Sequence, residues 1–245
     1  MYANIFQRLN ELPLSEAARQ CLPSCDTPQD FVRCLRDKGL AGDALTVLPH
    51  LLPHRVAIWW GCLCVWDAHR LQASEPHLLA MEAIVRWVHL PSEPHRRTCE
   101  HFGRALGMNI SPGALAMAAF WSGGSMSAPG MPHVPPPAGL AAQVVAGALH
   151  LAAVQRDAQH YLDHVRQYLA IGLDVAAGRL LWTPSGTVAD RPEHARPPLD
   201  TPQVSDRLRV LHSGGHRLHG PHATSPGVGA APMVQPSLSA YEVLP

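Results

Sequence analysis

Helix start signals recur along most of this chain, and they constrain its fold more than any other feature of the sequence. Ser15, Thr27 and Ser92 each stand where a helical pattern begins, and their side chains can accept hydrogen bonds from the free N–H groups of a first helical turn. Proline follows within two residues of Thr27 and of Ser92, where its missing N–H costs nothing. No run of alternating apolar and polar residues is long enough to predict a strand. We therefore predict an all-α protein, either an irregular multi-helix bundle or a short helical array.

A tryptophan-rich segment, residues 54–71, is the expected centre of this fold. Trp59, Leu63 and Trp66 lie on one face of its helix, and further apolar side chains widen that face. The other helices are expected at residues 15–22, 27–39, 41–52, 74–90, 92–106, 111–121, 140–154 and 157–182. The helices that start at residues 74 and 92 begin with the same four residues, Ser-Glu-Pro-His. We interpret this match as convergent capping, because the offset is shorter than a helix-pair repeat.

The chain divides into a helical domain at residues 1–182 and a tail at residues 183–245. The tail is rich in proline, glycine, serine and histidine, so it cannot bury enough apolar surface to offset the entropy lost on ordering. We predict that it is disordered. Inside the helical domain, residues 122–137 form a long loop without a helical or strand period.

The charge balance argues against a nucleic-acid partner. Charged residues make up 16% of the chain and the formal net charge is zero, so no basic surface is expected to capture nucleic acid or acidic membranes. The longest apolar stretch, residues 140–154, is too short to span a bilayer. No basic segment leads into an apolar one at the start of the chain, which favours a cytoplasmic location.

The cysteines and histidines give only weak metal candidates. The six cysteines have uneven spacings without a C-x-x-C pair, and we interpret them as reduced thiols that mostly pack as small apolar groups. His160 and His164 are four residues apart near Asp157, so both could face one ion on a helix. A zinc protease needs glutamate directly after the first histidine, and Tyr161 stands there. We therefore predict no metal site and no cofactor.

The loop and the tryptophans are the candidate binding surface. The loop contains glycines that widen its choice of conformations and a proline run that favours an extended backbone. Long loops of this kind are often functional, although a spacer between two helices is the alternative. Trp60 lies off the main apolar stripe, so it either packs in the core or faces a partner. The predicted protein-binding residues are Trp60, Trp121, Ser122, Gly123, Gly124, Ser125, Pro135, Pro136 and Pro137. Ser125 lacks the last glycine and the preceding strand of a nucleophile elbow, so we predict no catalytic residue.

Three segments together resemble an uncharacterised family of bacterial helical proteins encoded near type VI secretion genes, beside PAAR-repeat spike tips. They are residues 57–66 (AIWWGCLCVW), 119–125 (AFWSGGS) and 134–137 (VPPP). The resemblance covers roughly residues 13–182. It implies a cytoplasmic helical accessory protein that serves as an adaptor or chaperone for a secreted component, and it implies no catalytic residues.

These observations favour a non-enzymatic, protein-binding accessory factor. Its partner would be another protein, such as a type VI secretion spike or effector. The alternatives are a metal-dependent enzyme that uses His160 and His164, and a secreted effector. The oligomeric state is left open.

Overall fold

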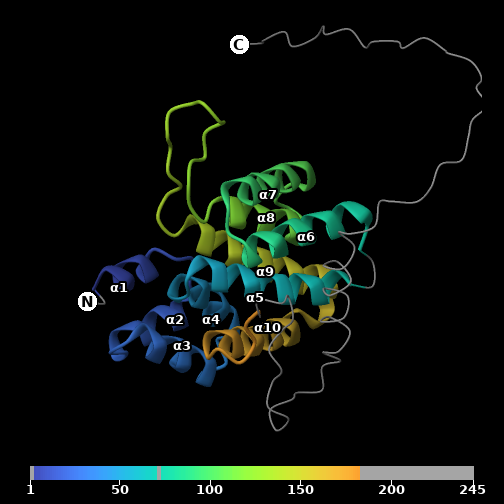
Figure 1. Cartoon of the computed structure of the whole chain (residues 1–245). Coiled ribbons are helices and arrows are strands. Elements are labelled where there is room, and N and C mark those ends of the chain that lie inside the picture. Colours follow the sequence, from blue (N-terminus) through green and yellow to red (C-terminus); the bar gives the residue numbers. More distant parts are fainter. Residues whose placement is uncertain (1–2, 71–72, 183–245) are drawn as a thin grey trace, which may run out of the picture.

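Ten α-helices and no strand make up the part of the chain that the structure, a computed structural model, describes: residues 3–70 and 73–182 (Figure 1). The helices are α1 (Ala3–Asn10), α2 (Glu16–Cys21), α3 (Pro28–Asp37), α4 (Ala41–Val47), α5 (His54–His69), α6 (Glu75–His89), α7 (Glu93–Leu106), α8 (Ser111–Phe120), α9 (Leu140–Arg156) and α10 (Tyr161–Ala176). Short 3-10 turns follow α2 (Leu22–Ser24), α4 (Leu48–Leu51) and α9 (Ala158–His160). The predicted fold class is confirmed. The tail predicted at residues 183–245 lies outside the described residues.

The predicted helix caps are present at most of the expected positions. The side chains of Ser15, Thr27 and Ser92 each accept a hydrogen bond from the backbone N–H three residues later, at 3.2, 3.1 and 3.4 Å. Ser74 holds the matching position before α6, but its side chain makes no such bond. Gly107 follows α7 with a φ of 78°, which confirms it as the end of that helix. The repeated Ser-Glu-Pro-His start therefore serves the two helices differently.

The helix bounds differ from the prediction at three places. Helix α1 was not predicted, because no N-cap signal precedes it, yet Leu9 is fully buried in the core. The segment expected at residues 41–52 leaves α geometry after Val47, since Pro49 lacks the N–H that a continuing helix needs. The last helix, expected at residues 157–182, spans Tyr161–Ala176, because Asp157 instead caps a 3-10 turn before it and the chain leaves α geometry after Ala176.

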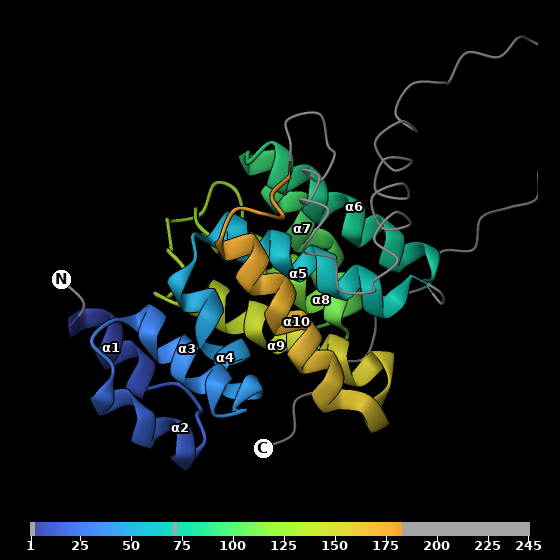
Figure 2. The same cartoon turned by 90° about the horizontal axis from the view of Figure 1, so that it is seen from below.

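Helix α5 lies in the middle of the molecule, as predicted. It contacts α6, α8, α9 and α10 (Figures 1 and 2). Every residue from 57 to 66 is buried, so this helix has no solvent face over almost three turns. Such a helix needs small residues where its neighbours come close. Gly61 is one, since a Cβ there would lie 2.4 Å from a methyl group of Leu115 on α8.

Trp60 joins α5 to α10 and is not available to a partner. Its side chain is fully buried, and its indole N–H donates to the backbone carbonyl of Tyr168 at 2.9 Å. The indole lies against Gly172, where a Cβ would come within 2.5 Å of the ring. The prediction that Trp60 contacts a partner is therefore wrong. Helix α10 covers the face of α5 that the main apolar stripe leaves free.

The end of the described chain also packs on α5. The indole N–H of Trp59 donates to the carbonyl of Leu180 at 2.8 Å, and its ring meets Trp182 edge-on at 6.2 Å. The guanidinium of Arg55 lies 4.5 Å from the centre of the Trp182 ring. The same guanidinium donates to the carbonyls of Val88 and His89 at the end of α6. Side chains in the first turns of α5 therefore contact both the segment after α10 and the C-terminal end of α6.

Helix α9 matches the prediction of an enclosed apolar helix on most of its surface. It packs against α4, α5, α8 and α10, while Gln143, Gly147 and Val154 are exposed. Across the described residues, no helix has both the length and the apolar character that crossing a membrane requires.

Candidate functional site: the anchored loop

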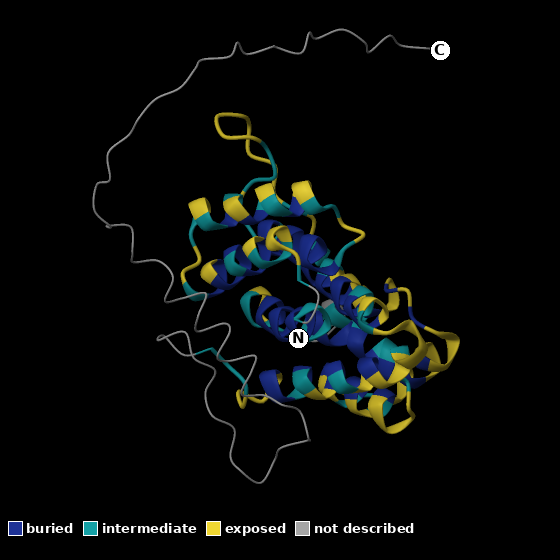
Figure 3. Cartoon of the chain, turned by 90° about the vertical axis from the view of Figure 1, so that its right-hand side faces the viewer, coloured by how far each residue is buried: buried dark blue, intermediate teal, exposed yellow. Residues whose placement is uncertain are grey.

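The segment between α8 and α9, residues 121–139, projects from the helical body and is called the anchored loop below. Figure 1 shows it leaving the body beside α7 and α8, and Figure 3 shows that its outer part is exposed. All residues from 128 to 135 are exposed. Met131 and Val134 retain 64% and 45% of their accessible surface. The loop therefore presents apolar side chains to the solvent.

Hydrogen bonds within the loop hold its two arms together. The backbone N–H of Met126 donates to the carbonyl of Val134 at 2.8 Å. The hydroxyl oxygen of Ser125 accepts from the backbone N–H groups of Ser127 and Val134, each at 3.1 Å. Ser125 thus joins the two arms at the neck of the loop.

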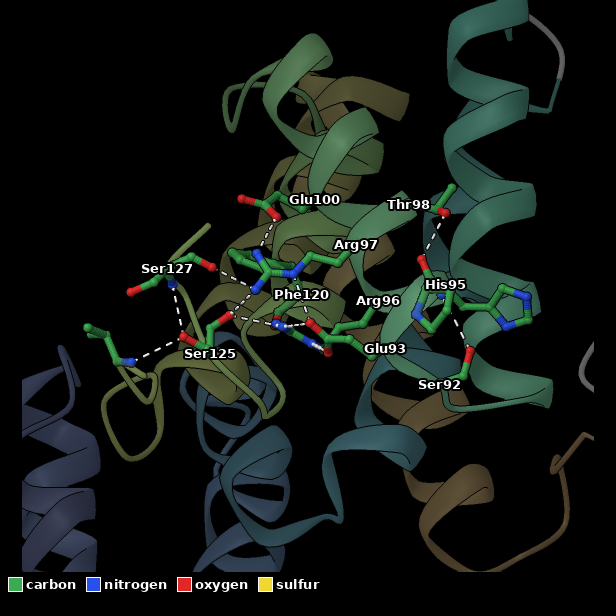
Figure 4. A network of polar contacts seen from close by, with 12 residues as sticks. Ser92, Glu93, His95, Arg96, Arg97, Thr98, Glu100, Phe120, Ser125 and Ser127 are labelled. Atoms are coloured by element: carbon green, nitrogen blue, oxygen red, sulfur yellow. Dashed lines mark hydrogen bonds and ion pairs between the residues drawn. The ribbon is translucent and has the colours of Figure 1, made fainter. Parts of the chain in front are cut away.

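Arg96 of α7 fixes the base of the loop. Its guanidinium donates to the carbonyls of Phe120 and Ser125 at 2.6 and 2.9 Å (Figure 4). It also pairs with Glu93 at 2.6 Å and lies 4.6 Å from the centre of the Phe120 ring. Only 4% of Arg96 is exposed. A charge this deeply buried is tolerated because the carboxylate and the two carbonyls replace its hydration.

Arg97 extends the same anchor along the loop. It donates to the carbonyls of Ser125 and Ser127 at 3.0 and 2.7 Å (Figure 4). Two carboxylates neutralise it, from Glu93 at 2.8 Å and from Glu100 at 2.9 Å. Hydrogen bonds and charge from Arg96 and Arg97 lower the pKa of Glu93 to about 2. The Glu93 carboxylate therefore remains charged at any physiological pH.

The start of α5 holds the loop from the other side. The Nδ1 of the His54 ring lies 2.8 Å from the carbonyl oxygen of Ser122, to which it can donate. His50, in the 3-10 turn after α4, lies next to Gly139 at the far end of the loop, where a Cβ would sit 3.7 Å from its ring. Both ends of the loop are thus attached to the body, while its outer part extends away.

We expect the protein to lose stability in mild acid through His50. Burial lowers the pKa of His50 to about 4, and the charges of Arg8 and His54 add to this effect. The unfolded chain binds a proton near pH 6.5 and the folded chain does not, so stability is complete above pH 6.5 and falls as the pH drops towards 4. At pH 5 this histidine should cost about 2 kcal/mol. In urea titrations at pH 7.5 and 5.0, His50→Gln should lose less stability than the wild type by that amount. Equal losses in both proteins would contradict the prediction.

The two loop glycines have different roles. Gly124 has a φ of +66°, and a Cβ there would lie 2.9 Å from the guanidinium of Arg96. Only glycine fits this position without strain or displacement of the arginine. Gly123 has no neighbour within 4 Å of its virtual Cβ, so it can be replaced. Gly124 is exposed, and its backbone conformation and its place beside Arg96 make it part of the anchor.

The other predicted loop residues divide between base and surface. Trp121, Ser122 and Ser125 are half-buried at the base of the loop. In the proline run, Pro135 and Pro137 are exposed while Pro136 is half-buried. The exposed outer part also includes Met131, which was not among the predicted contact residues.

The candidate metal ligands do not converge. His160 is exposed and pairs with Asp157 at 2.6 Å, which raises the pKa of the histidine. His164 is buried, and its Nδ1 lies 3.1 Å from the carbonyl oxygen of Ala153. The 3-10 turn that ends at His160 breaks the helical spacing on which the pairing depended. Over residues 3–70 and 73–182, no group of three or more His, Cys, Asp or Glu is arranged to hold a metal ion.

A serine–histidine pair that the sequence did not reveal joins α5 to α8. The Nε2 of His69 lies 2.8 Å from the hydroxyl oxygen of Ser111. The Gln155 amide donates to the carbonyl of Asn109, and its oxygen accepts from the backbone N–H and the hydroxyl of Ser111. The hydroxyl proton of Ser111 therefore points to Gln155, so its oxygen accepts from His69. Ser111 is fully buried. This geometry caps α8 and does not activate a nucleophile.

Arg96 and Arg97 are the main residues that sequence reasoning missed. Two adjacent arginines near the start of α7 are unfavourable against the positive end of the helix dipole. Their presence was a signal that another group must compensate. Glu93 could be identified as that group from the sequence, but the loop carbonyls could not.

Comparison with known protein families decides where this chain belongs. A family of unknown function, DUF6931, matches residues 31–176, which is more than half of the chain. The chain belongs to this family. The match starts in α3, ends with the last residue of α10 and contains α7, α8 and the whole anchored loop. No curated protein and no solved structure matches the chain. Membership in DUF6931 assigns no activity.

Proposed function

We propose that this chain is a non-enzymatic protein-binding accessory factor and that the anchored loop is its binding element. The observation that carries the proposal is an exposed apolar segment held away from the body by a buried arginine. Arg96 is costly to bury, and it pairs with Glu93 and contacts the first part of the loop. A spacer between two helices does not need such an anchor, whereas a binding element gains affinity from being preorganised.

The outer loop has the composition of a protein contact. Residues 121–139 contain no aspartate, glutamate, lysine or arginine, and Met131 and Val134 are exposed. Exposed apolar groups that are clustered and fixed mark interaction sites on soluble proteins. Prolines in the loop also reduce the entropy that ordering on binding would cost.

The proline run indicates the chemistry of the partner surface. Three consecutive prolines favour an extended polyproline II backbone, and residues 134–137 (VPPP) are largely exposed. Segments of this type bind in shallow grooves lined by aromatic side chains. We propose that the partner offers such a groove to the loop. Because the loop contains no aspartate, glutamate, lysine or arginine, the interaction should depend little on salt.

The candidate partner is a type VI secretion spike or an effector that is loaded onto it. This identity rests only on the resemblance of the tryptophan-rich segment, the Gly-Gly segment and the proline run to proteins encoded near such genes. The binding role of the loop does not depend on it.

Affinity capture from native cells tests the proposal. The tagged wild-type protein should recover one stoichiometric protein, identified by mass spectrometry. The double variant Met131→Asp, Val134→Asp should reduce its affinity at least ~10-fold, because two charges would enter an apolar contact. Circular dichroism and Tm should stay unchanged, since both side chains are exposed.

Met108→Asp is the matched control. Met108 is also an exposed methionine, with 45% of its surface accessible, but it lies in the turn between α7 and α8. The Met108→Asp variant should bind the partner with the affinity of the wild type. Equal capture by the wild type and the loop variant would show that the loop does not contact the partner. Capture of no partner by the wild type would overturn the proposed function.

A further inference from the structure

Two histidines lie together where α5 ends and α6 begins, and the proposed function uses neither of them. His69 is the last residue of α5, and His77 lies in the first turn of α6. Their ring centres are 5.4 Å apart and their ring planes meet at 67°. Both residues are half-buried. His54, which holds the anchored loop, is at the opposite end of α5, about 22 Å away along the helix axis, so the pair is separate from the loop.

Hydrogen bonds to α8 and α9 fix the protonation of the His69 ring. Its Nε2 atom lies 2.8 Å from the hydroxyl oxygen of Ser111 and 3.2 Å from the amide oxygen of Gln155. The Ser111 hydroxyl donates its proton to the same amide oxygen at 2.7 Å, so both neighbours of Nε2 accept. The proton of the neutral ring is therefore on Nε2, and its Nδ1 atom has a free lone pair. Burial lowers the pKa of His69, which keeps the ring neutral at pH 7.

His77 presents a ring nitrogen without a partner. Its Nδ1 atom is shielded from solvent and has no hydrogen-bond partner in the part of the chain that the structure describes. Buried polar atoms are almost always paired, and an exception calls for a water molecule or an ion. Imidazole nitrogens are favourable ligands for Zn²⁺, Ni²⁺ and Cu²⁺. His77 can therefore supply a second nitrogen ligand beside that of His69.

The spacing of the two rings suits a shared ion. A bond of about 2.0–2.1 Å from Zn²⁺ to nitrogen puts each ring centre roughly 3.2 Å from the ion, so two imidazoles at a tetrahedral angle have centres about 5 Å apart. The observed 5.4 Å is close to this value. We propose that His69 and His77 bind one divalent transition-metal ion, such as Zn²⁺, through their Nδ1 atoms.

The neighbours of the pair determine what kind of metal site it is. Histidines that bind metals usually donate their other ring N–H to a nearby group that orients the ring, and Ser111 and Gln155 have this place beside His69. Among the described residues, no third His, Cys, Asp or Glu completes the site, so water or a group from another molecule takes the remaining positions. Binding should be weaker than at a structural zinc site, which has four protein ligands.

Thermal unfolding of the full chain, freed of metal by a chelator and titrated with zinc chloride, is the first test. An ion that binds only the folded chain stabilises it, so Tm should rise by about 4 °C at ten times the Kd. His77→Gln should remove this rise, and His69→Gln should do the same. His160→Gln is the control, because His160 is exposed and pairs with Asp157 instead; it should keep the rise. An equal rise in His77→Gln and the wild type would overturn the proposal.

A second measurement identifies the residues, because the chain contains 16 histidines. Histidines are modified with diethyl pyrocarbonate, with and without zinc, and mapped by mass spectrometry. At ten times the Kd about nine in ten sites are occupied, so His69 and His77 should react roughly 10-fold more slowly, while His160 should react as before. In His77→Gln, zinc should no longer protect His69. Protection of His69 that persists in this variant, or protection confined to other histidines, would contradict a shared ion.

Discussion

Trp60→Ala should lower the free energy of unfolding by about 3–5 kcal/mol, the range for removing a large buried aromatic side chain. The indole fills the contact between α5 and α10, and a Cβ on Gly172 would already come within 2.5 Å of it. The substitution also removes the buried hydrogen bond from the indole to the carbonyl of Tyr168, and the loss of this bond adds to the destabilisation. Urea denaturation followed by circular dichroism measures the effect.

Trp121→Ala is the control for this prediction. Trp121 is half-buried at the base of the anchored loop, so its removal should cost about 1–2 kcal/mol, roughly half of the buried case. A similar small loss for Trp60→Ala, together with weaker partner binding, would mean that Trp60 faces a partner and that α10 does not cover it.

Arg96→Met should release the anchored loop and cost about 2–3 kcal/mol of stability. Methionine keeps the aliphatic bulk but leaves the carbonyl of Phe120 without a donor, and an unsatisfied buried polar group costs on this scale. Arg97 still reaches the carbonyl of Ser125, so the loop is loosened and the rest of the fold persists. Limited proteolysis with a protease of broad specificity, mapped by mass spectrometry, should show faster cleavage at residues 121–139.

Arg104→Met provides the comparison on the same helix. Arg104 is mostly exposed and pairs with Glu100 at 2.9 Å, and surface ion pairs of this kind contribute about 0–1 kcal/mol. Its cleavage pattern should match that of the wild type. If Arg96→Met were also cleaved at the same rate and sites as the wild type, the loop would hold its shape without the buried arginine. Because the partner contact is proposed to need a fixed loop, Arg96→Met should also weaken capture of the partner while Arg104→Met should not.

The position of the candidate site in the chain could be predicted from the sequence, but the contacts that hold the loop could not. The absence of any secondary-structure period after Trp121 marked the loop, and two of the three prolines predicted as contact residues, Pro135 and Pro137, are exposed. The guanidinium of Arg96 was not connected to the loop, because Arg96 and Ser125 are 29 residues apart and no local pattern joins them. Gly124 lies on the surface, but for the same reason the sequence did not reveal that its neighbour is that guanidinium.

The all-α class, the order of most helices and the caps at Ser15, Thr27 and Ser92 could be predicted from the amino-acid sequence. These features depend on groups within four residues of each other, so the chain alone contains the information. The enclosure of Trp60 by α10 and the different partners of His160 and His164 became apparent only from the packing of the helices. The support of the loop by Arg96 became apparent in the same way. Each of these outcomes depends on which distant segment packs alongside, and that is set by the joint burial of all the helices and not by any one of them.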